Sequence, residues 1–545
     1  MRPPAGPRKR GGAALVAAGI LLSRLAGFVR QRVFAHYLGT MDAADAYNAA
    51  FKIPNFLQNL LGEGVLSASF IPVYAQLRAR AERLGQSEAE ARKLASAVAG
   101  LLGLLTGLLC LMGIFATPFL IGAIAPGFTG EKRALTIRLV QIFFPGIALL
   151  VLSAFCIGVL NSHHKFFLSY AAPVIWSAAQ IAALVFGDRA HTGGTPALAI
   201  WAAWGSVAGA LLQLMLQLPS VLRLLGGIGP GGFWPTLGRG NAYAAEVVRN
   251  FLPVVTGRGV VQLSAYLDSF IASWLPTGGV AALAYAQTIY LLPISLFGMS
   301  ISAAALPSMS AAQGEGGDEA REALRVQLQR GLRAIAYPVV PAVIAMLVLG
   351  DVICAALFRT GRFGSDQVIY VSRILAGSTI GLLAATQARL YSSAYYALKD
   401  TRTPLVFAAL RVLATGLLGL LCGLWLPRAL HVDLSLGAVG LTASAGIAGW
   451  GEFLLLQRGI HRRIGEVSLP KRLQLELWGC AAVSGCVGAL ARHLLGLGPR
   501  LHPLLVAAIV FALFGLVYLA TTSLLGVPEA EGMLRRLRLK RSRPN

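Results

Sequence analysis

About fourteen stretches of roughly twenty mainly apolar residues follow one another along the chain, with short glycine, proline and charge clusters between them. A helix of that length crosses the hydrocarbon core of a bilayer. Of the 545 residues, 56% are hydrophobic and only 13% are charged. The sequence therefore predicts an all-α polytopic membrane protein, with spans near residues 13–38, 44–77, 94–122, 134–160, 167–187, 195–222, 246–274, 279–312, 334–358, 367–397, 404–426, 434–457, 474–494 and 502–526.

The formal net charge of +24 would suggest a nucleic-acid partner in a soluble protein, but its distribution indicates a membrane topology instead. Alternate loops hold roughly thirty Lys and Arg, against roughly eight in the others. This asymmetry predicts that both termini are cytoplasmic and that the basic tail of residues 527–545 marks the inner face. We expect residues 1–22 to stay on the chain, because their apolar run continues to Leu38 without a convincing cleavage site.

A polar stripe follows the second apolar segment. At about 100° per residue its members fall within roughly an 80° sector of one helix; they are Asp45, Asn48, Lys52, Asn55, Asn59 and Glu63. An ionised side chain at bilayer depth costs about 2.5–3.5 kcal/mol on insertion scales, so such residues face water or a partner. The stripe predicts a water-accessible cavity.

Arginines near this stripe point to an anionic ligand. Arg24 and Arg30 precede it, and Arg258, Gln262 and Ser269 share one face of a later helix. A guanidinium suits bidentate contact with a phosphate or pyrophosphate headgroup. The candidate substrate-binding residues are Arg24, Arg30, Asp45, Lys52, Asn55, Glu63, Arg258 and Gln262. The alternative is intramolecular pairing, in which Asp45, Glu63 and Asp268 neutralise Arg24, Lys52 and Arg258.

No motif for an enzyme can be placed on the chain. The G-x-x-x-x-G-K-[ST] phosphate loop is absent, so ATP hydrolysis is not expected. The eight histidines lack metal-ligand spacing, and the six cysteines lack CxxC spacing. We expect a transporter without a catalytic residue, cofactor or metal.

The two halves of the chain resemble each other at an offset of about 235–239 residues. Pro54 corresponds to Pro293 and Pro72 to Pro307, and the link between apolar segments at 161–165 corresponds to the link at 398–402. Because six helices per half is an even number, the repeat is expected to be parallel, with the substrate site between the halves. The expected divisions are a basic cytoplasmic N-terminus at 1–12, a six-helix lobe at 13–222 and a cytoplasmic linker at 223–245. A second six-helix lobe at 246–457, a cytoplasmic loop at 458–473, two extra helices in 474–526 and the basic tail 527–545 follow.

Several motifs together resemble the MurJ (MviN) family of lipid II flippases. They are Ser23-Arg-Leu-Ala-Gly-Phe-Val-Arg30, Asp45-Ala-Tyr-Asn-Ala-Ala-Phe-Lys-Ile-Pro-Asn55, Gly62-Glu-Gly64, Ser69-Phe-Ile-Pro-Val-Tyr74 and Leu398-Lys-Asp-Thr-Arg-Thr-Pro404. The resemblance implies the fold of the multidrug/oligosaccharidyl-lipid/polysaccharide exporters and alternating access. It also implies transfer of undecaprenyl-pyrophosphate-linked lipid II from the inner to the outer leaflet of the bacterial cytoplasmic membrane for peptidoglycan synthesis. Membrane lipids and cell-wall synthesis proteins are the partners it implies, without nucleic acid.

By position, Arg24 and Arg30 resemble the family's cavity arginines, and Asp45, Lys52, Asn55 and Glu63 resemble its second-helix residues. The chain departs from the family where Gln58 or Asn59 and Thr288 replace arginines, and we expect Arg258 or Arg32 to compensate. Three other functions are considered. The chain could be an ion-coupled small-molecule exporter using Asp45 and Asp268, a flippase for another polyprenyl-linked glycan, or a membrane scaffold for cell-wall enzymes.

Overall fold

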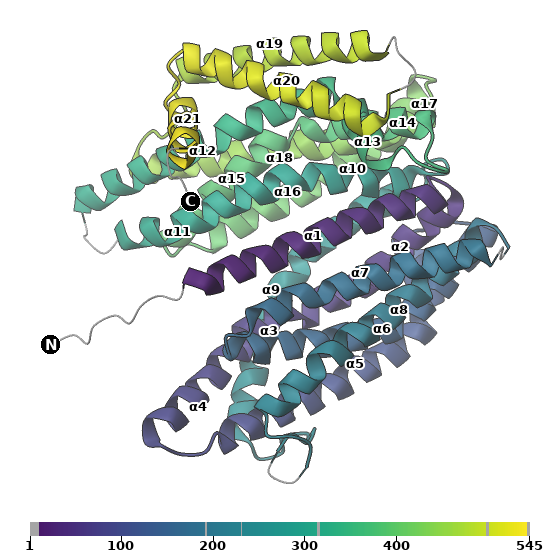
Figure 1. Cartoon of the computed structure of the whole chain (residues 1–545), viewed down its shortest axis with the longest axis vertical. Coiled ribbons are helices and arrows are strands. Elements are labelled where there is room, and N and C mark those ends of the chain that lie inside the picture. Colours follow the sequence, from purple (N-terminus) through teal and green to yellow (C-terminus); the bar gives the residue numbers. More distant parts are fainter. Residues whose placement is uncertain (1–9, 191–192, 230–231, 313–316, 497–500, 542–545) are drawn as a thin grey trace. The chain divides into compact units, whose positions relative to one another are not determined.

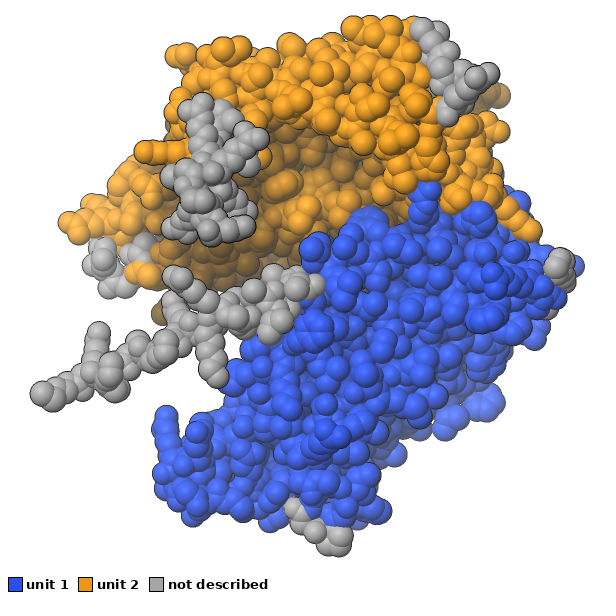
Figure 2. All heavy atoms as spheres, viewed as in Figure 1, with its two compact units in different colours: residues 1–280 blue, residues 281–545 orange. Residues whose placement is uncertain are grey.

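The computed structural model describes residues 10–190, 193–229, 232–312, 317–496 and 501–541. Parts of the expected terminal segments 1–12 and 527–545 lie outside these residues. By internal contacts the chain forms two compact units, Met1–Val280 and Ala281–Asn545 (Figure 2). Helix α9 thus belongs to the first unit, and the six-helix lobe boundaries expected from the repeat remain a prediction.

The described residues of the first unit form a helical bundle, α1 to α9 (Figure 1). The helix α8 packs extensively on α6 and α7, while α1 packs on α7 and α2 packs on α6. The helices are α1 (Arg10–Leu38), α2 (Asp42–Leu61), α3 (Glu63–Ser69), α4 (Ile71–Leu84), α5 (Ala89–Ile124), α6 (Gly130–Ser162), α7 (Phe166–Arg189), α8 (Thr195–Leu224) and α9 (Ala242–Ala272).

In the second unit, α18 packs against α14, α15 and α16, and the last long helices α19 and α20 pack on each other. The side chains of Leu349, Val352 and Phe514 join α20 to the junction of α12 and α13 through a buried apolar cluster. The helices are α10 (Gly279–Pro293), α11 (Ser300–Ala312), α12 (Gly317–Val348), α13 (Gly350–Phe358), α14 (Ser365–Thr379), α15 (Leu382–Ala397), α16 (Arg402–Leu420), α17 (Leu426–Ala429), α18 (Gly437–Ile464), α19 (Lys471–Gly496), α20 (Pro503–Leu524) and α21 (Pro528–Arg541). Short π-helical turns are η1 (Ile294–Met299) and η3 (Leu421–Trp425), and η4 (Leu434–Leu436) is a 3-10 turn.

The all-α membrane class is confirmed. Among the described residues, 11 helices are long and apolar enough to cross a bilayer, or up to 12 if the bent pair α14 and α15 is one span. This is fewer than the fourteen expected. The helices α1 and α9 have 29 and 31 residues and meet the length requirement alone. Each of the fourteen predicted stretches coincides with one helix or a run of consecutive helices.

The polar second segment is broken, not continuous. Helix α2 ends at Leu61, and Gly62 has an extended backbone before α3 begins. A Cβ at Gly62 would lie 2.3 Å from the Gln58 carbonyl oxygen, so only glycine fits this break without movement. The corresponding segment of the second unit, α10 to α11, is interrupted by the π-helical turn η1.

The two links that match in the repeat share an unusual backbone turn. His164 has φ 58° and Lys399 has φ 61°, and the two residues are separated by about 235 positions. In the described chain only one other non-glycine residue, His431, has a positive φ. Because the left-handed conformation costs an L-residue roughly 1–2 kcal/mol, the shared turn supports the expected repeat.

Candidate functional site

The Arg30 guanidinium is held inside the first unit by three other helical side chains. Its Nη1 donates to Gln180 Oε1 at 3.3 Å, and its Cζ lies 4.9 Å from the centre of the Trp176 ring. The Tyr47 hydroxyl donates to the same Gln180 oxygen at 3.0 Å. Gln180 is only 2% exposed, so α1, α2 and α7 fix this arginine together.

Part of this guanidinium is left available. Arg30 Nε is buried and has no hydrogen-bond partner among the described residues, and the same is true of Trp176 Nε1 and Gln180 Nε2. A buried donor without a partner costs about 1–3 kcal/mol, so such groups are commonly satisfied by water or a ligand. The three donors therefore form a cluster suited to an anion or to acceptor oxygens.

A polar cavity of about 400 Å³ adjoins this cluster. Trp176 lines it, together with Gln58 and Asn59 from α2. The remaining lining residues are Gly64, Leu150, Ala154, Ile157, Pro173 and Gln213. This cavity lies within the first unit, beside the end of α2 that carries Asn59.

Buried polar groups continue behind the cavity wall. Gln213 Nε2 donates to Ser153 Oγ at 2.8 Å, and Ser153 Oγ donates to Gln217 Oε1 at 2.7 Å. All three residues are buried on α6 and α8, two helices of high hydropathy. These two consecutive hydrogen bonds orient the Gln213 amide that lines the cavity, because each bond restricts the position of the side chain that makes the next one.

The middle of the stripe docks α2 onto α9. Lys52 Nζ donates to Ser269 Oγ, and the Tyr266 hydroxyl donates to the Lys52 carbonyl oxygen at 2.7 Å. Phe56 packs edge-on against Tyr266, with ring centroids 5.4 Å apart. Lys52 also experiences the negative charge of Asp268. These contacts favour a packing role for Lys52.

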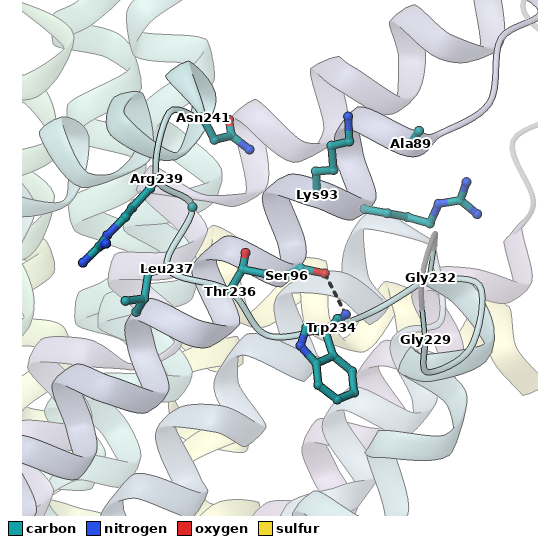
Figure 3. A pocket seen from close by; sticks show the side chains of 12 residues that line it. Ala89, Lys93, Ser96, Gly229, Gly232, Trp234, Thr236, Leu237, Arg239 and Asn241 are labelled. Carbon is teal, nitrogen blue, oxygen red and sulfur yellow. Dashed lines mark hydrogen bonds between the residues drawn. The ribbon is translucent and has the colours of Figure 1, made fainter.

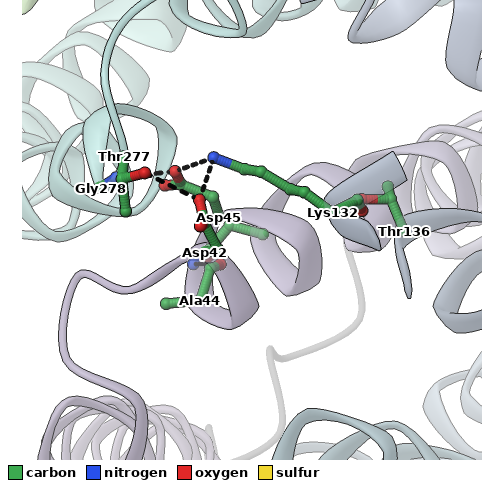
Figure 4. Close-up of polar contacts among 8 residues, drawn as sticks. Asp42, Ala44, Asp45, Lys132, Thr136, Thr277 and Gly278 are labelled. Carbon is green, nitrogen blue, oxygen red and sulfur yellow. Dashed lines mark hydrogen bonds and ion pairs between the residues drawn. The ribbon is translucent and has the colours of Figure 1, made fainter. Parts of the chain in front are cut away.

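The first turn of α2 carries an ion-pair cluster (Figure 4). Lys132 Nζ lies 2.6 Å from Asp45 Oδ2 and 2.9 Å from Asp42 Oδ1. The Gly278 backbone N–H donates to Asp45 Oδ2 at 2.7 Å, and Thr277 Oγ1 donates to Asp42 Oδ1 at 3.0 Å. This cluster, hereafter the Lys132 clamp, joins the starts of α2 and α6 to the segment after α9.

A glycine is required in the Lys132 clamp. Gly278 has φ 90°, a conformation that L side chains rarely adopt, and a Cβ there would lie 2.5 Å from the Thr40 carbonyl oxygen. Its N–H can therefore approach Asp45, whose side chain is only 1% exposed. The Asp45 carboxylate is thus paired with Lys132, a cation that the sequence did not single out.

The other candidate residues are more scattered. Arg24 is exposed on α1, and Asn55 Oδ1 accepts a long 3.5 Å hydrogen bond from Asn59. Glu63 begins α3, and Arg258 and Gln262 lie in α9, but the side chains of these three residues lie outside the described part of the structure. The structure places Arg30 against Trp176, which lines the polar cavity, and directs Asp45 and Lys52 to contacts within the protein.

Lys132, Trp176, Gln180 and Gln213 were missed by the sequence reasoning. Lys132 reads as an ordinary charge at a helix start, and the others are single polar or aromatic residues in apolar helices. A glutamine on a membrane helix was an available signal, because an amide at that depth needs a partner. Among the described residues, no group of three or more His, Cys, Asp and Glu could hold a metal ion.

The second unit carries intramembrane charges of its own. Arg411 Nε on α16 lies 2.9 Å from Glu452 Oε2 on α18, and Arg389 on α15 interacts electrostatically with both. Paired charges on apolar helices, together with a polar cavity, are typical of a polytopic membrane transporter.

Comparison with known proteins agrees with this class. The family model described as lipid II flippase MurJ matches residues 34–508. The probable lipid II flippase MurJ of Rhizobium meliloti is 32% identical over 448 residues, 81% of this chain and 79% of the relative. The lipid II flippase MurJ of Burkholderia cenocepacia is 30% identical over 445 residues, 81% of this chain and 82% of the relative.

Two solved structures share the fold. A lipid II flippase MurJ in an inward closed conformation gives a TM-score of 0.75 at 23% identity, covering 94% of this chain and 98% of that one. An inward-facing multidrug resistance MATE family transporter of the MOP superfamily gives 0.62 at 17% identity, covering 83% and 98%. The chain belongs to the lipid II flippase MurJ family, a family of transporters and not of enzymes.

Proposed function

We propose that this protein moves lipid II, the undecaprenyl-pyrophosphate-linked peptidoglycan precursor, from the inner to the outer leaflet of the bacterial cytoplasmic membrane. Family membership over residues 34–508 supports this function. The structural observation that carries it is the Arg30 guanidinium, which has a buried Nε without a partner beside a polar cavity. A pyrophosphate offers the acceptor oxygens that these donors lack.

In this proposal Arg30 contacts the pyrophosphate, while Trp176 and Gln180 orient the guanidinium. Both termini are cytoplasmic, the lobes alternate access, and cell-wall synthesis proteins are partners. The positive-inside asymmetry and the family membership support these statements. Arg24, Asn55, Glu63, Arg258 and Gln262 remain further candidates for the substrate site.

The small-molecule exporter has less support. Its ion carriers would be Asp45 and Asp268, but the Asp45 carboxylate already accepts hydrogen bonds from Lys132 and from the Gly278 backbone. A carboxylate that is neutralised in this way offers little to a transported cation.

Substitution of Arg30 tests the proposal. Arg30→Gln should reduce lipid II translocation by about tenfold or more, because a charge-assisted contact to phosphate is worth about 1.5–3 kcal/mol. Arg30→Lys should restore only part of it, since lysine lacks the planar fork. Arg133→Gln, which alters an exposed arginine on α6, is the matched control.

The measurement is the accessibility of lipid II to an external probe after depletion of the wild-type protein. Arg30→Gln with normal expression and normal lipid II accessibility would refute a headgroup contact by Arg30. Unchanged accessibility after depletion, in cells without a second flippase, would refute the proposed function itself.

A further inference from the structure

A second cavity lies at one end of the first unit, between the start of α5 and the loop that joins α8 to α9 (Figure 3). Its volume is about 1030 Å³. It is distinct from the polar cavity beside Arg30, with which it shares no lining residue. The lining residues are Ala89, Arg92, Lys93, Ser96, Gly229, Gly232, Trp234, Thr236, Leu237, Gly238, Arg239 and Asn241.

The charged groups of this loop cavity are all cations. Arg92, Lys93 and Arg239 line it, and none of the described lining residues is a carboxylate. Lys93 forms an exposed ion pair with Glu90 at 3.2 Å, so its charge is partly compensated. Arg92 Nε is buried without a hydrogen-bond partner among the described residues, and Arg239 forms no ion pair among them. Two arginines are therefore available to an anion.

The loop is fixed on α5. The Trp234 N–H donates to Ser96 Oγ at 3.2 Å, and the Thr236 N–H donates to the Ser96 carbonyl oxygen at 3.1 Å. A Cβ at Gly100 would lie 2.2 Å from the Thr236 carbonyl oxygen, so a glycine permits this close approach. The cavity wall is thus set by backbone hydrogen bonds to a buried serine, as Figure 3 shows for Trp234.

Large apolar side chains accompany the cations. Trp234 is 62% exposed and Leu237 is 44% exposed, and both line the cavity. The cavity adjoins the first turns of the span Ala89–Ile124 and follows the end of the span Thr195–Leu224. The ends of membrane spans generally lie near the lipid headgroups, where tryptophan is enriched and basic pockets bind anionic headgroups.

We propose that the loop cavity binds the headgroup of an anionic phospholipid, with Arg92 and Arg239 on the phosphodiester and with Trp234 and Leu237 against the first carbons of the acyl chains. A soluble phosphate would use the two arginines but would leave the apolar wall uncovered. The lipid therefore fits the whole lining better than a free anion. This site does not depend on the proposed lipid II function, because it uses none of the residues around Arg30.

The test measures lipid binding by the full-length purified protein in detergent. Phosphatidylglycerol, phosphatidylcholine or soluble glycerol phosphate is added, and bound lipid is counted by native mass spectrometry. The R92Q/R239Q double variant should bind phosphatidylglycerol at least about tenfold more weakly than the wild type, because two charge-assisted contacts are lost. The control R80Q/R83Q removes two exposed arginines of α4 that do not line the cavity, and should bind as the wild type does.

Trp234→Ser is a second variant that keeps both arginines, and it should also weaken phosphatidylglycerol binding. Three outcomes would overturn the proposal. They are equal binding by R92Q/R239Q and the wild type, equal loss in R80Q/R83Q, and competition by glycerol phosphate as strong as that by phosphatidylglycerol. The last outcome would indicate a site for soluble anions.

Discussion

Removal of the Lys132 charge should destabilise the protein strongly, because the buried carboxylate of Asp45 would lose its ion pair with Lys132. Asp45 is 1% exposed, and Lys132 is its partner at 2.6 Å. After Lys132→Met, the Gly278 N–H at 2.7 Å would be the remaining hydrogen bond to Asp45 Oδ2 among the contacts of the Lys132 clamp. Breaking a buried ion pair by removing one partner costs about 3–5 kcal/mol.

The two ion pairs of the Lys132 clamp should differ sharply in how much they contribute to the free energy of unfolding. Asp42 is 57% exposed, so its ion pair with Lys132 is screened by solvent, and Asp42→Asn should cost less than about 1 kcal/mol. Lys132→Met should therefore have the larger effect by several kcal/mol. The double variant Lys132→Met/Asp45→Asn removes both charges together, and its loss should be smaller than the sum of the two single losses.

Chemical unfolding of the purified protein in detergent, followed by tryptophan fluorescence, measures these free energies. Equal losses for Lys132→Met and Asp42→Asn would refute the argument from burial. Additive losses in the double variant would refute the direct pairing of Lys132 with Asp45. Transport assays on these variants test the predicted role of Asp45 in substrate binding. A contact with the substrate would lower lipid II translocation by Asp45→Asn without a matching loss of stability.

Three further outcomes are expected. Gly113→Ala should destabilise the protein by about 1–3 kcal/mol in the same unfolding assay, because its Cβ would lie 2.1 Å from the Phe144 ring. The control Gly103→Ala, on the same helix, meets nothing within 4 Å and should be neutral or slightly stabilising. Burial lowers the pKa of His163 from 6.5 to about 4, so the folded protein binds this proton less readily than the unfolded chain does. Unfolding measured at a series of pH values should therefore show stability falling as the pH falls from about 6.5 to 4, and the fall should be smaller in His163→Gln. Hydrogen bonds from the Thr403 backbone and side chain lower the pKa of Asp400 from 3.8 to about 2. The contribution of Asp400 to stability should therefore be present above pH 3.8 and lost as the pH falls towards 2, and Asp400→Asn should remove that part of the pH dependence.

The spans of the fold could be predicted from the sequence, because each needs only a local run of apolar residues. The break at Gly62 could not, because the polar pattern continues from Asn59 to Glu63 with helical spacing. The close approach that a Cβ at Gly62 would make to the Gln58 carbonyl oxygen depends on the folded backbone, and hydrophobic periodicity does not report it.

The site was predictable in part. The polar stripe of α2 predicted a cavity, and of the stripe residues Asn59 is among those that line the polar cavity of the first unit. The partners of its charges could not be read from the sequence, because Asp45 meets Lys132 across 87 residues and Arg30 meets Gln180 across 150. Pairings at such separations depend on how helices pack, and several carboxylates were equally available to each cation along the chain.

The matched links at His164 and Lys399 show that one backbone turn can be stabilised by different side chains. In the first link the neighbouring His163 ring contacts the Tyr74 hydroxyl at 3.0 Å, whereas in the second the Asp400 carboxylate accepts a hydrogen bond from the Thr403 backbone N–H. The left-handed turn therefore does not depend on one set of contacts, and each link has its own means of fixing the chain between two helices.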